Sequence, residues 1–482
     1  MTDIDVAIVG GGLGGLSAAA HLARAGRRVA VFDKNDHVGG FATSYRRGEF
    51  RFEASLHLLD ACRPGEPNHA VLVSAGIADR LELAMHPVLH REIWPSRGLD
   101  LAIPQGEEGL IQALSELRPA AGPALRRLLS IAGWAHESAY RYLEQGMAIS
   151  QVEQVGLRQL MSRTAEDLLR EHVEDAYLQD LLGTLACYQI IPARDLAALQ
   201  YLLLLCGYHR YSGVYPLGGS RSIAEALAAV VREHGGSVQC RAEVTQLMAG
   251  RDGVLGCRLA DGTEVRSGHV VSAVAPPITF GRLLDPSQVP RRWKQRLDAM
   301  ALSPSLVRLS LGLDLDPRSR GLDDYEIFVG EALEVDGDLN TVVVTLPARL
   351  DPRVAPRGKG VLSMTVRAPA AWGTRVTPES RDDLATRLLE VADRHVLPGL
   401  REHVEVRDLA HPGTYARYSG APRGAVLGYA STPRHSGTRQ LGASTPLRNL
   451  FLAGGWVFPG SGQSAALWSG RIAAQHVLGA TT

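Results

Sequence analysis

Residues 5–33 read DVAIVGGGLGGLSAAAHLARAGRRVAVFD, and this stretch decides the fold. Its apolar run at 5–9 predicts a β-strand. The next residues have apolar side chains at helical spacing up to Gly26, and residues 28–32 predict a second strand. A strand, a glycine-rich turn, a helix and a second strand within about 30 residues are typical of the nucleotide-binding unit of a doubly wound α/β domain.

The glycines of the turn follow the pattern G-x-G-x-x-G, at Gly10, Gly12 and Gly15. The first permits the tight turn, the second lets the backbone approach a pyrophosphate, and the third lets the helix pack closely on the sheet. The positive end of the helix dipole favours the phosphate charge. Asp33 ends the second strand, where its carboxylate can accept hydrogen bonds from ribose hydroxyls. The stretch therefore predicts a dinucleotide site that suits FAD or NAD.

The composition is that of a globular protein, with 482 residues, of which 45% are hydrophobic and 21% are charged. Basic and acidic residues number 51 each, which argues against a broad basic surface and hence against nucleic-acid binding. Five cysteines without a C-x-x-C pair argue against a disulfide framework, and the histidines lack H-E-x-x-H spacing, so no metal site is predicted. A reduced, cytoplasmic location is expected, because neither a signal peptide nor an apolar run of about 18 residues is found.

One apolar run, residues 196–207 (LAALQYLLLLCG), is shorter than a membrane span and carries Gln200. Protein core is the favoured interpretation of this run. The alternative is a peripheral contact with a membrane from which a lipophilic substrate is drawn.

The pattern of the chain changes several times. Residues 76–211 contain several amphipathic helical segments, 276–415 mix strands with one helix, and 449–478 return to a strand, a Gly-rich turn and a helix. Residues 50–60 alternate like a strand. The expected domains are 1–75, 212–275 and 416–482 as three parts of one nucleotide-binding domain, 76–211 as a mostly helical substrate or lid region, and 276–415 as a mixed α+β substrate domain.

Five stretches together resemble the phytoene desaturase superfamily of FAD oxidoreductases, within the wider flavin amine oxidase fold. The resemblance is strongest to the carotenoid isomerase and retinol saturase branch. The stretches are 6–44 (VAIVGGGLGGLSAAAHLARAGRRVAVFDKNDHVGGFATS), 51–61 (RFEASLHLLDA), 213–247 (GVYPLGGSRSIAEALAAVVREHGGSVQCRAEVTQL), 259–276 (LADGTEVRSGHVVSAVAP) and 445–474 (TPLRNLFLAGGWVFPGSGQSAALWSGRIAA).

The resemblance implies FAD as the cofactor and an α/β fold: a Rossmann-like FAD-binding domain, a mixed α+β substrate domain and a helical insert. This sequence departs from the family pattern at Gly455, where many relatives have an acidic residue, and at Ser55, where relatives often have glycine. The cofactor-binding residues that it implies are Gly10, Gly12, Leu13, Gly14, Gly15, Asp33, Lys34, Gly39, Gly40, Thr43, Val244, Gly454, Gly455, Trp456, Gly462, Gln463 and Ser464.

A desaturase of this type needs mainly an apolar tunnel that presents a C–H bond to flavin N5, which accepts a hydride. His57 is the first candidate for a polar group near the flavin, because a neutral imidazole can move a proton; a structural histidine is the alternative. The candidates for lining the substrate cavity are Tyr188, Tyr208, Tyr215 and Arg308.

The resemblance predicts an FAD enzyme that desaturates, saturates, isomerises or cyclises a long lipophilic polyene, of carotenoid, isoprenoid or polyketide type. A flavin amine oxidase is the alternative. Many amine oxidases place a lysine near N5, and the three lysines here, Lys34, Lys294 and Lys359, do not lie in apolar strands. A non-enzymatic flavin-dependent scaffold is the least favoured interpretation, and the sequence leaves the oligomeric state open.

Overall fold

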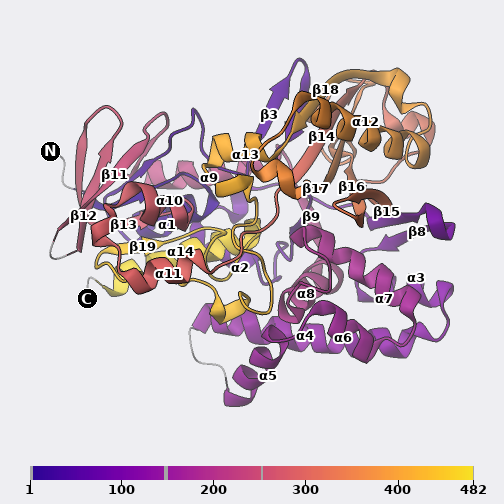
Figure 1. The fold of residues 1–482 in the computed structure, drawn as a ribbon, viewed down its shortest axis with the longest axis horizontal. Coiled ribbons are helices and arrows are strands. Elements are labelled where there is room, and N and C mark those ends of the chain that lie inside the picture. The colour runs from indigo at the N-terminus through magenta and orange to yellow at the C-terminus, as the bar shows by residue number, and fades with distance from the viewer. Residues whose placement is uncertain (1–3, 146–149, 251–252, 481–482) are drawn as a thin grey trace.

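The computed structural model describes residues 4–145, 150–250 and 253–480. The described residues form two seven-stranded β-sheets and two small sheets, β3-β4 and β5-β9-β6, with helices around them (Figure 1). The strands are β1 (Ile4–Val9), β2 (Val29–Phe32), β3 (Ser44–Arg47), β4 (Phe50–Glu53), β5 (Leu59–Asp60), β6 (Leu83–Ala84), β7 (Val88–Trp94), β8 (Leu99–Pro104), β9 (Gly213–Pro216), β10 (Ser237–Gln239), β11 (Val244–Gly250), β12 (Gly253–Leu259), β13 (Glu264–Ser272), β14 (Leu306–Leu313), β15 (Glu326–Val335), β16 (Asp338–Thr345), β17 (Gly360–Arg367), β18 (Val404–Ala410) and β19 (Leu450–Leu452). The helices are α1 (Leu13–Arg24), α2 (His69–Ala75), α3 (Glu107–Leu117), α4 (Ala121–Gln145), α5 (Gln151–Met161), α6 (Ala165–His172), α7 (Ala176–Gly183), α8 (Ala198–Leu205), α9 (Ser220–Glu233), α10 (Pro276–Ile278), α11 (Arg291–Asp298), α12 (Pro378–His395), α13 (Pro412–Ser419) and α14 (Gln463–Gly479).

The first sheet has the predicted nucleotide-binding unit at its centre. Its strands run in the order β10-β2-β1-β13, all parallel, with β19 parallel to β13 and the antiparallel pair β12 and β11 beyond. All four residues of β2 are buried, as expected for a parallel strand that helices cover on its faces. The α/β fold class is confirmed.

Small residues let the first and last helices approach closely. A Cβ added to Gly470 of α14 would lie 2.3 Å from the Gly14 carbonyl oxygen of α1, and the Ser17 hydroxyl donates to the Leu467 carbonyl at 2.7 Å. Residues far apart in sequence therefore build one face of this domain, and Figure 1 shows both termini on that side of the molecule.

The second sheet is antiparallel except at one pair of strands. Its order is β18-β14-β17-β16-β15-β7-β8, with β7 parallel to β15. Strands β7 and β8 come from the 76–211 segment, which the sequence predicted as mostly helical, so this segment contributes an edge to the second sheet. The proposed domain boundaries themselves stay a prediction.

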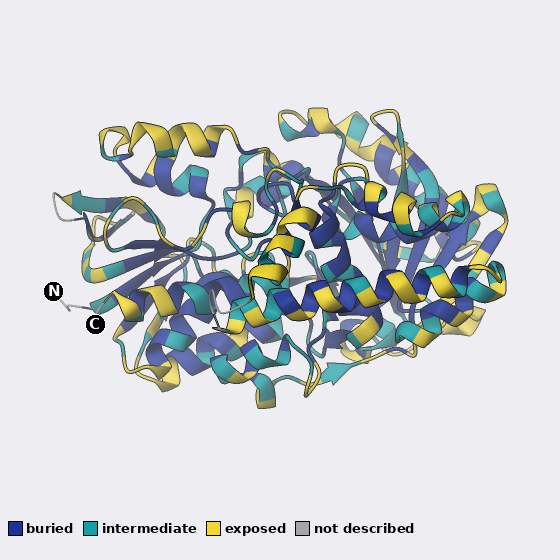
Figure 2. Ribbon diagram, turned by 90° about the horizontal axis from the view of Figure 1, so that it is seen from below, coloured by how far each residue is buried: buried dark blue, intermediate teal, exposed yellow. Residues whose placement is uncertain are grey.

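The two faces of the second sheet differ in chemistry. One face is apolar and packs against α12, as in the contact of Leu309 and Val344 with Leu388 in one core cluster. The other face carries buried polar residues at alternate positions: Arg308, Ser310, Glu326, Thr345, Ser363 and Thr365. Figure 2 shows most strand residues in the buried colour, with the exposed residues on the outward sides of the helices.

The helical insert contains α3 to α8 and continues into the main core. Helix α4 buries residues at helical spacing, such as Leu125, Leu128 and Leu129, against its neighbours. The 196–207 run forms α8 and a π-helical turn, and its Ala198, Tyr201, Leu202 and Leu205 lie in that core. None of the helices in the described part of the chain combines the length and the apolar character that a membrane span requires.

Candidate active site

A cavity of about 990 Å³ runs from the first sheet into the space between the helical insert and the second sheet. It begins at the carboxyl ends of the parallel strands, where Gly10, Asp33, Ala273 and Gly454 follow β1, β2, β13 and β19. Ligands of open α/β sheets bind at this edge. The far part of the cavity lies among α4 to α8 and the β15–β16 hairpin.

Backbone atoms build the wall of the first part. Gly10 has φ +98°, a left-handed conformation that glycine adopts readily, and its N–H donates to the Phe32 carbonyl at 2.8 Å. A Cβ on Gly15 would lie 2.1 Å from the Gly10 oxygen, so only glycine fits at the start of the helix. A Cβ on Gly12 would meet no atom within 4 Å. Gly12 therefore faces open space at the N-terminus of α1.

The second glycine pair lies against the first turn. Gly39 and Gly12 form an isolated parallel bridge, and the Gly39 N–H donates to the Gly11 carbonyl at 2.7 Å. A Cβ on Gly40 would lie 3.3 Å from the Gly12 Cα. Gly12 and Gly39 are 27 residues apart in the sequence, and the two glycine turns together form one concave surface, which we call the glycine cradle.

Asp33 also supports this cradle. Its Oδ2 accepts the Gly11 N–H at 2.8 Å, and its Oδ1 accepts the Asn35 N–H at 2.8 Å and the Asn35 side-chain amide at 3.1 Å. The neighbouring Lys34 lines the cavity but donates to the Arg417 carbonyl at 2.9 Å. Asp33 thus fixes the glycine turn and also lines the cavity.

The C-terminal glycine turn closes the other side. A Cβ on Gly14 would lie 2.4 Å from the Gly454 backbone, and the Gly454 N–H donates to Ser469 Oγ at 3.0 Å. Gly462 precedes α14, and a Cβ there would meet no atom within 4 Å. The side-chain amide of Gln463, which lines the cavity, has both polar atoms buried without a hydrogen-bond partner in the described structure.

These features fit a bound dinucleotide with a flavin ring. Open space at the positive ends of α1 and α14 suits a pyrophosphate and a polar ring edge, and the unpaired Gln463 amide requires a partner. Most of the cofactor-binding residues that the resemblance implies line the cavity. The exceptions are Gly15, which contacts Gly10, and Thr43, whose buried hydroxyl has no partner among the described residues.

His57 belongs to a buried polar cluster. It lies between β4 and β5 rather than in the continuous strand predicted at 50–60, because the strand is interrupted at 54–58. His57 Nδ1 lies 2.8 Å from Glu326 Oε1, and the Tyr188 hydroxyl donates to Glu326 Oε2. The Glu326 side chain is fully buried, whereas His57 and Tyr188 line the cavity. Burial, together with the Glu326 charge, raises the pKa of Tyr188 well above its usual value.

The four residues predicted to line the substrate cavity have different positions. Tyr188 and Tyr208 line it, with their rings stacked at 4.9 Å, and the Tyr208 hydroxyl donates to the Leu58 carbonyl at 3.0 Å. The prediction is corrected for Tyr215 and Arg308, which are buried behind the wall.

Arg308 donates to Thr365 at 2.9 Å and to Thr345 at 3.2 Å, so side chains of the polar sheet face take up two of its nitrogens, while its Nε is buried without a partner among the described residues. Tyr215 lies on β9 near Glu53, which accepts from the Ser220 hydroxyl at 2.6 Å. Burial raises the pKa of Glu53 to about 7.

A family model described as flavin-containing amine oxidoreductase matches residues 13–478. The chain belongs to this family. Its members contain a flavin, and FAD is the cofactor of this flavoenzyme, an oxidoreductase.

The flavoenzyme is similar to named relatives along almost its whole length. It is 23% identical to a chloroplastic prolycopene isomerase of Daucus carota, over 98% of this chain and 80% of the relative. It is 24% identical to a neurosporene-forming phytoene desaturase of Rhodobacter capsulatus, over 98% and 93%. Among solved structures, a wild-type putrescine oxidase bound to putrescine matches with a TM-score of 0.70 and 18% identity, over 99% of each chain. That structural likeness concerns the fold.

The sequence reasoning missed two acidic residues that contact cavity-lining side chains of the flavoenzyme: Glu326, which is buried behind His57 and Tyr188, and Asp60. Glu326 is the one charged residue in the apolar run YEIFVG at 325–330, which is the signal that could have identified it. Asp60 lines the cavity and accepts from Ser464 Oγ at 2.9 Å, and burial raises the pKa of its carboxyl. Asp60 therefore ties the first turn of α14 to β5.

Proposed function

We propose that this flavoenzyme acts on a long lipophilic polyene or isoprenoid, by desaturation, saturation, isomerisation or cyclisation. We further propose that the glycine cradle holds the pyrophosphate of FAD and that the turn before α14 faces its flavin ring. The observation that carries the proposal is the cavity, which continues from the cradle into a long space with mainly aliphatic and aromatic walls. These wall residues include Leu143, Leu157, Met161, Leu199, Leu203, Leu204 and Phe458.

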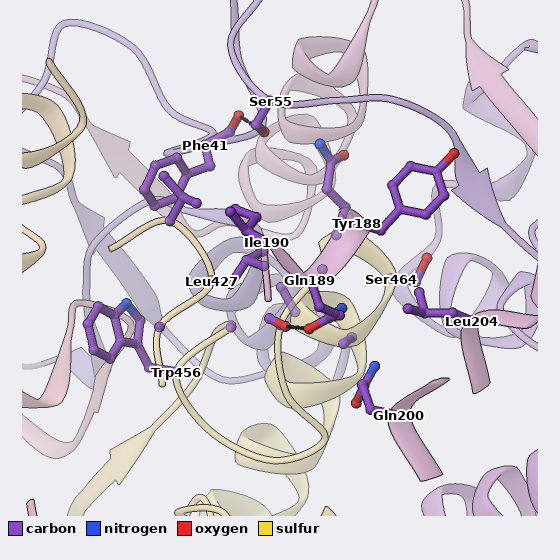
Figure 3. Close-up of a pocket in the computed structure, with 18 of the residues that line it drawn as sticks. Phe41, Ser55, Tyr188, Gln189, Ile190, Gln200, Leu204, Leu427, Trp456 and Ser464 are labelled. Carbon is purple, nitrogen blue, oxygen red and sulfur yellow. Dashed lines mark hydrogen bonds between the residues drawn. The ribbon is translucent and has the colours of Figure 1, made fainter. Parts of the chain in front are cut away.

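Figure 3 shows how this space is enclosed. Phe41, Ile190, Leu427 and Trp456 gather on one side, while Leu204 and Tyr188 project from the opposite side. Such walls bind an extended hydrocarbon chain and exclude water from the reacting carbon atoms. Bound FAD supplies a centre at N5 that accepts or returns a hydride.

His57 is the proposed proton-transfer group. Glu326, on the Nδ1 side of the ring, orients the imidazole and favours the tautomer with a proton on Nδ1. Nε2 then has no hydrogen-bond partner among the described residues and is available to a substrate carbon or a water in the cavity. Tyr188, bound to the same carboxylate, positions the ring from the side, with ring centroids 5.6 Å apart.

An amine substrate receives less support. Lys294 and Lys359 do not line the cavity, and Lys359 forms an ion pair with Glu405 at 2.6 Å. Lys34 lines the predicted ribose end and donates to a backbone carbonyl there. No lysine in the described part of the chain is therefore placed beside the substrate region.

The test is an anaerobic titration of the FAD-loaded protein with polyenes and amines, followed by the visible flavin absorption band. The panel holds lycopene precursors, retinol, a polyene polyketide, putrescine and benzylamine. The same panel is then added to protein whose flavin has been reduced with dithionite.

Bleaching by a polyene, or re-oxidation of the reduced flavin by one, supports the proposal. Spectral shifts that saturate with a polyene, together with isomerised product, support it for a redox-neutral reaction. Bleaching by an amine with no response to any polyene overturns it in favour of amine oxidation.

A further inference from the structure

Helix α8 presents four side chains to the substrate part of the cavity: Leu199, Gln200, Leu203 and Leu204. Gln200, Leu203 and Leu204, at the spacing i, i+3, i+4, are half-buried, whereas Tyr201 and Leu202 are buried in the core. Leucine in place of Gln200 would make this helix face wholly apolar, as suits a ligand that is hydrocarbon along its whole length. The chain instead has an amide among the leucines of this face.

The Gln200 amide has no hydrogen-bond partner within the described residues. Figure 3 shows the Gln200 amide in the space below the labelled Leu204 and Gln189. An apolar ligand that covered Gln200 would remove its water and replace none of its hydrogen bonds, which disfavours binding.

A second polar group lines the same cavity, on a segment that packs against α8. The Ser436 hydroxyl lines the cavity and is buried without a partner among the described residues, with the residue 1% exposed. The following residue, Gly437, packs on α8: a Cβ there would lie 3.4 Å from the side chain of Leu199, the neighbour of Gln200.

Gln189 adds a second side-chain amide to the cavity lining, next to Ser461. Its Oε1 accepts the Ser461 hydroxyl at 3.0 Å, and this bond leaves the Gln189 amide nitrogen unused. Gln189, Gln200 and Ser436 can each donate a hydrogen bond, and Gln200 and Ser436 can also accept one.

We propose that the substrate carries an oxygen or amide group that hydrogen-bonds to Gln200 and Ser436. The substrate class is thereby narrowed to polyenes with a hydroxyl, carbonyl or carboxamide, as opposed to pure hydrocarbons. This inference rests on the proposed function, because it concerns the same cavity and substrate.

The experiment uses three polyenes with one carbon skeleton that differ only at the end group: axerophthene with a methyl, retinol with a hydroxymethyl and retinamide with a carboxamide. Their dissociation constants are measured anaerobically with the FAD-loaded protein through perturbation of the flavin spectrum. The variants are Gln200→Leu, Ser436→Ala and, as a control, Gln159→Leu. Gln159 is exposed on α5 and does not line the cavity.

The wild type and Gln159→Leu should bind retinol or retinamide about tenfold more tightly than axerophthene. Gln200→Leu should abolish this preference by strengthening axerophthene binding and weakening that of the polar ligands. Ser436→Ala removes a hydroxyl that has no partner among the described residues, and it should reduce the preference severalfold. This second variant keeps the test decisive if Gln200→Leu does not fold.

Equal binding of all three polyenes by the wild type would overturn the inference and leave the proposed function intact. A preference that survives in both Gln200→Leu and Ser436→Ala would do the same. If no polyene perturbs the flavin and an amine does, the proposed function fails, and this inference fails with it.

Discussion

The two ends of the cavity are lined by different groups, backbone atoms at one end and side chains at the other. At the nucleotide end, the wall is backbone: Gly15 packs on Gly10 and Gly14 on Gly454 at distances that a side chain would prevent. At the substrate end, the wall is made of side chains from α4 to α8 and from the second sheet. A backbone wall recognises a group common to all members of a family, whereas a side-chain wall can change its specificity by single substitutions.

The polar groups differ in the same way. Asp33 at the nucleotide end accepts from residues within 22 positions along the chain, whereas His57 at the substrate end meets Glu326, which lies 269 positions away. The first glycine turn is thus fixed by local contacts, whereas the C-terminal turn that closes the nucleotide end and the His57–Glu326 pair depend on long-range folding. The following predictions test this division, in order of decreasing effect.

The largest effect is expected from Gly12→Glu. A side chain at this position enters open space, so the fold should persist, but the added bulk and negative charge occupy the place of the pyrophosphate. Purified Gly12→Glu should be colourless, with an FAD-to-protein ratio below about one tenth of the wild type and no turnover. The ratio is measured by absorption after gel filtration, with circular dichroism to verify the fold.

Gly442→Glu is the matched control for this variant, because Gly442 is exposed, has open space around it and does not line the cavity. It should retain FAD. A folded Gly12→Glu protein that also stays yellow would contradict the assignment of the cradle.

The next effect is expected at the substrate end, from His57→Gln. Loss of a proton-transfer group lowers turnover by about 10²-fold or more, while FAD stays bound because the cradle is untouched. Glu326→Gln should lower turnover by about tenfold and shift the pH profile, since the carboxylate only orients the imidazole. Steady-state rates at several pH values and the FAD content are the measurements; unchanged turnover of His57→Gln would make His57 structural.

A smaller effect is expected on the free energy of unfolding, through Glu53. Its carboxyl group accepts a hydrogen bond from Ser220 at the start of α9. Burial raises its pKa from 4.5 to about 7 in the folded state, so the folded protein holds the proton more tightly than the unfolded chain. The contribution of Glu53 to the free energy of unfolding is therefore complete below about pH 4.5, and it is lost as the pH rises through 7.

Glu53→Gln cannot ionise, so it should be more stable than the wild type at pH 8, by on the order of 2–3 kcal/mol, and equal to it near pH 4.5. Thermal melts across this pH range, with excess FAD throughout, measure the difference. A difference that does not change with pH would show that Glu53 is not the titrating group.

The smallest effect is expected from Tyr215→Phe. The Tyr215 hydroxyl is buried without a partner among the described residues and lies outside the cavity, so its removal should change the free energy of unfolding by less than about 1 kcal/mol. The KM for the substrate should not change. A large rise in KM would show that Tyr215 does contact the substrate, as the sequence predicted.

Local signals account for what the sequence could predict. The strand, turn and helix around Gly10 to Gly15 follow from glycine spacing and apolar periodicity, and the structure contains these elements at the predicted positions. Gly454 and Gly462 were implied by the family resemblance, which rests on a glycine-rich turn that precedes a helix, and the structure contains that helix as α14.

Long-range pairing accounts for what was missed. Strand β7 joins the second sheet through β15, with Arg91 opposite Ile327, and no local pattern announces a partner that far along the chain. Arg308 was expected to face the cavity because it lies on an apolar strand. In the structure, hydroxyls of neighbouring strands bind two of its nitrogens instead, an arrangement that depends on sheet register.

The contact between the first and last helices has a consequence for biosynthesis. Gly14 meets the Gly454 backbone, and Ser17 donates to Leu467, so the cradle is incomplete until residues 454–467 have left the ribosome. A nascent chain that already contains its glycine fingerprint has only half of its cofactor site. FAD capture is therefore expected to wait for the synthesis of α14, and a chain that stops short of α14 is expected to be released without its flavin.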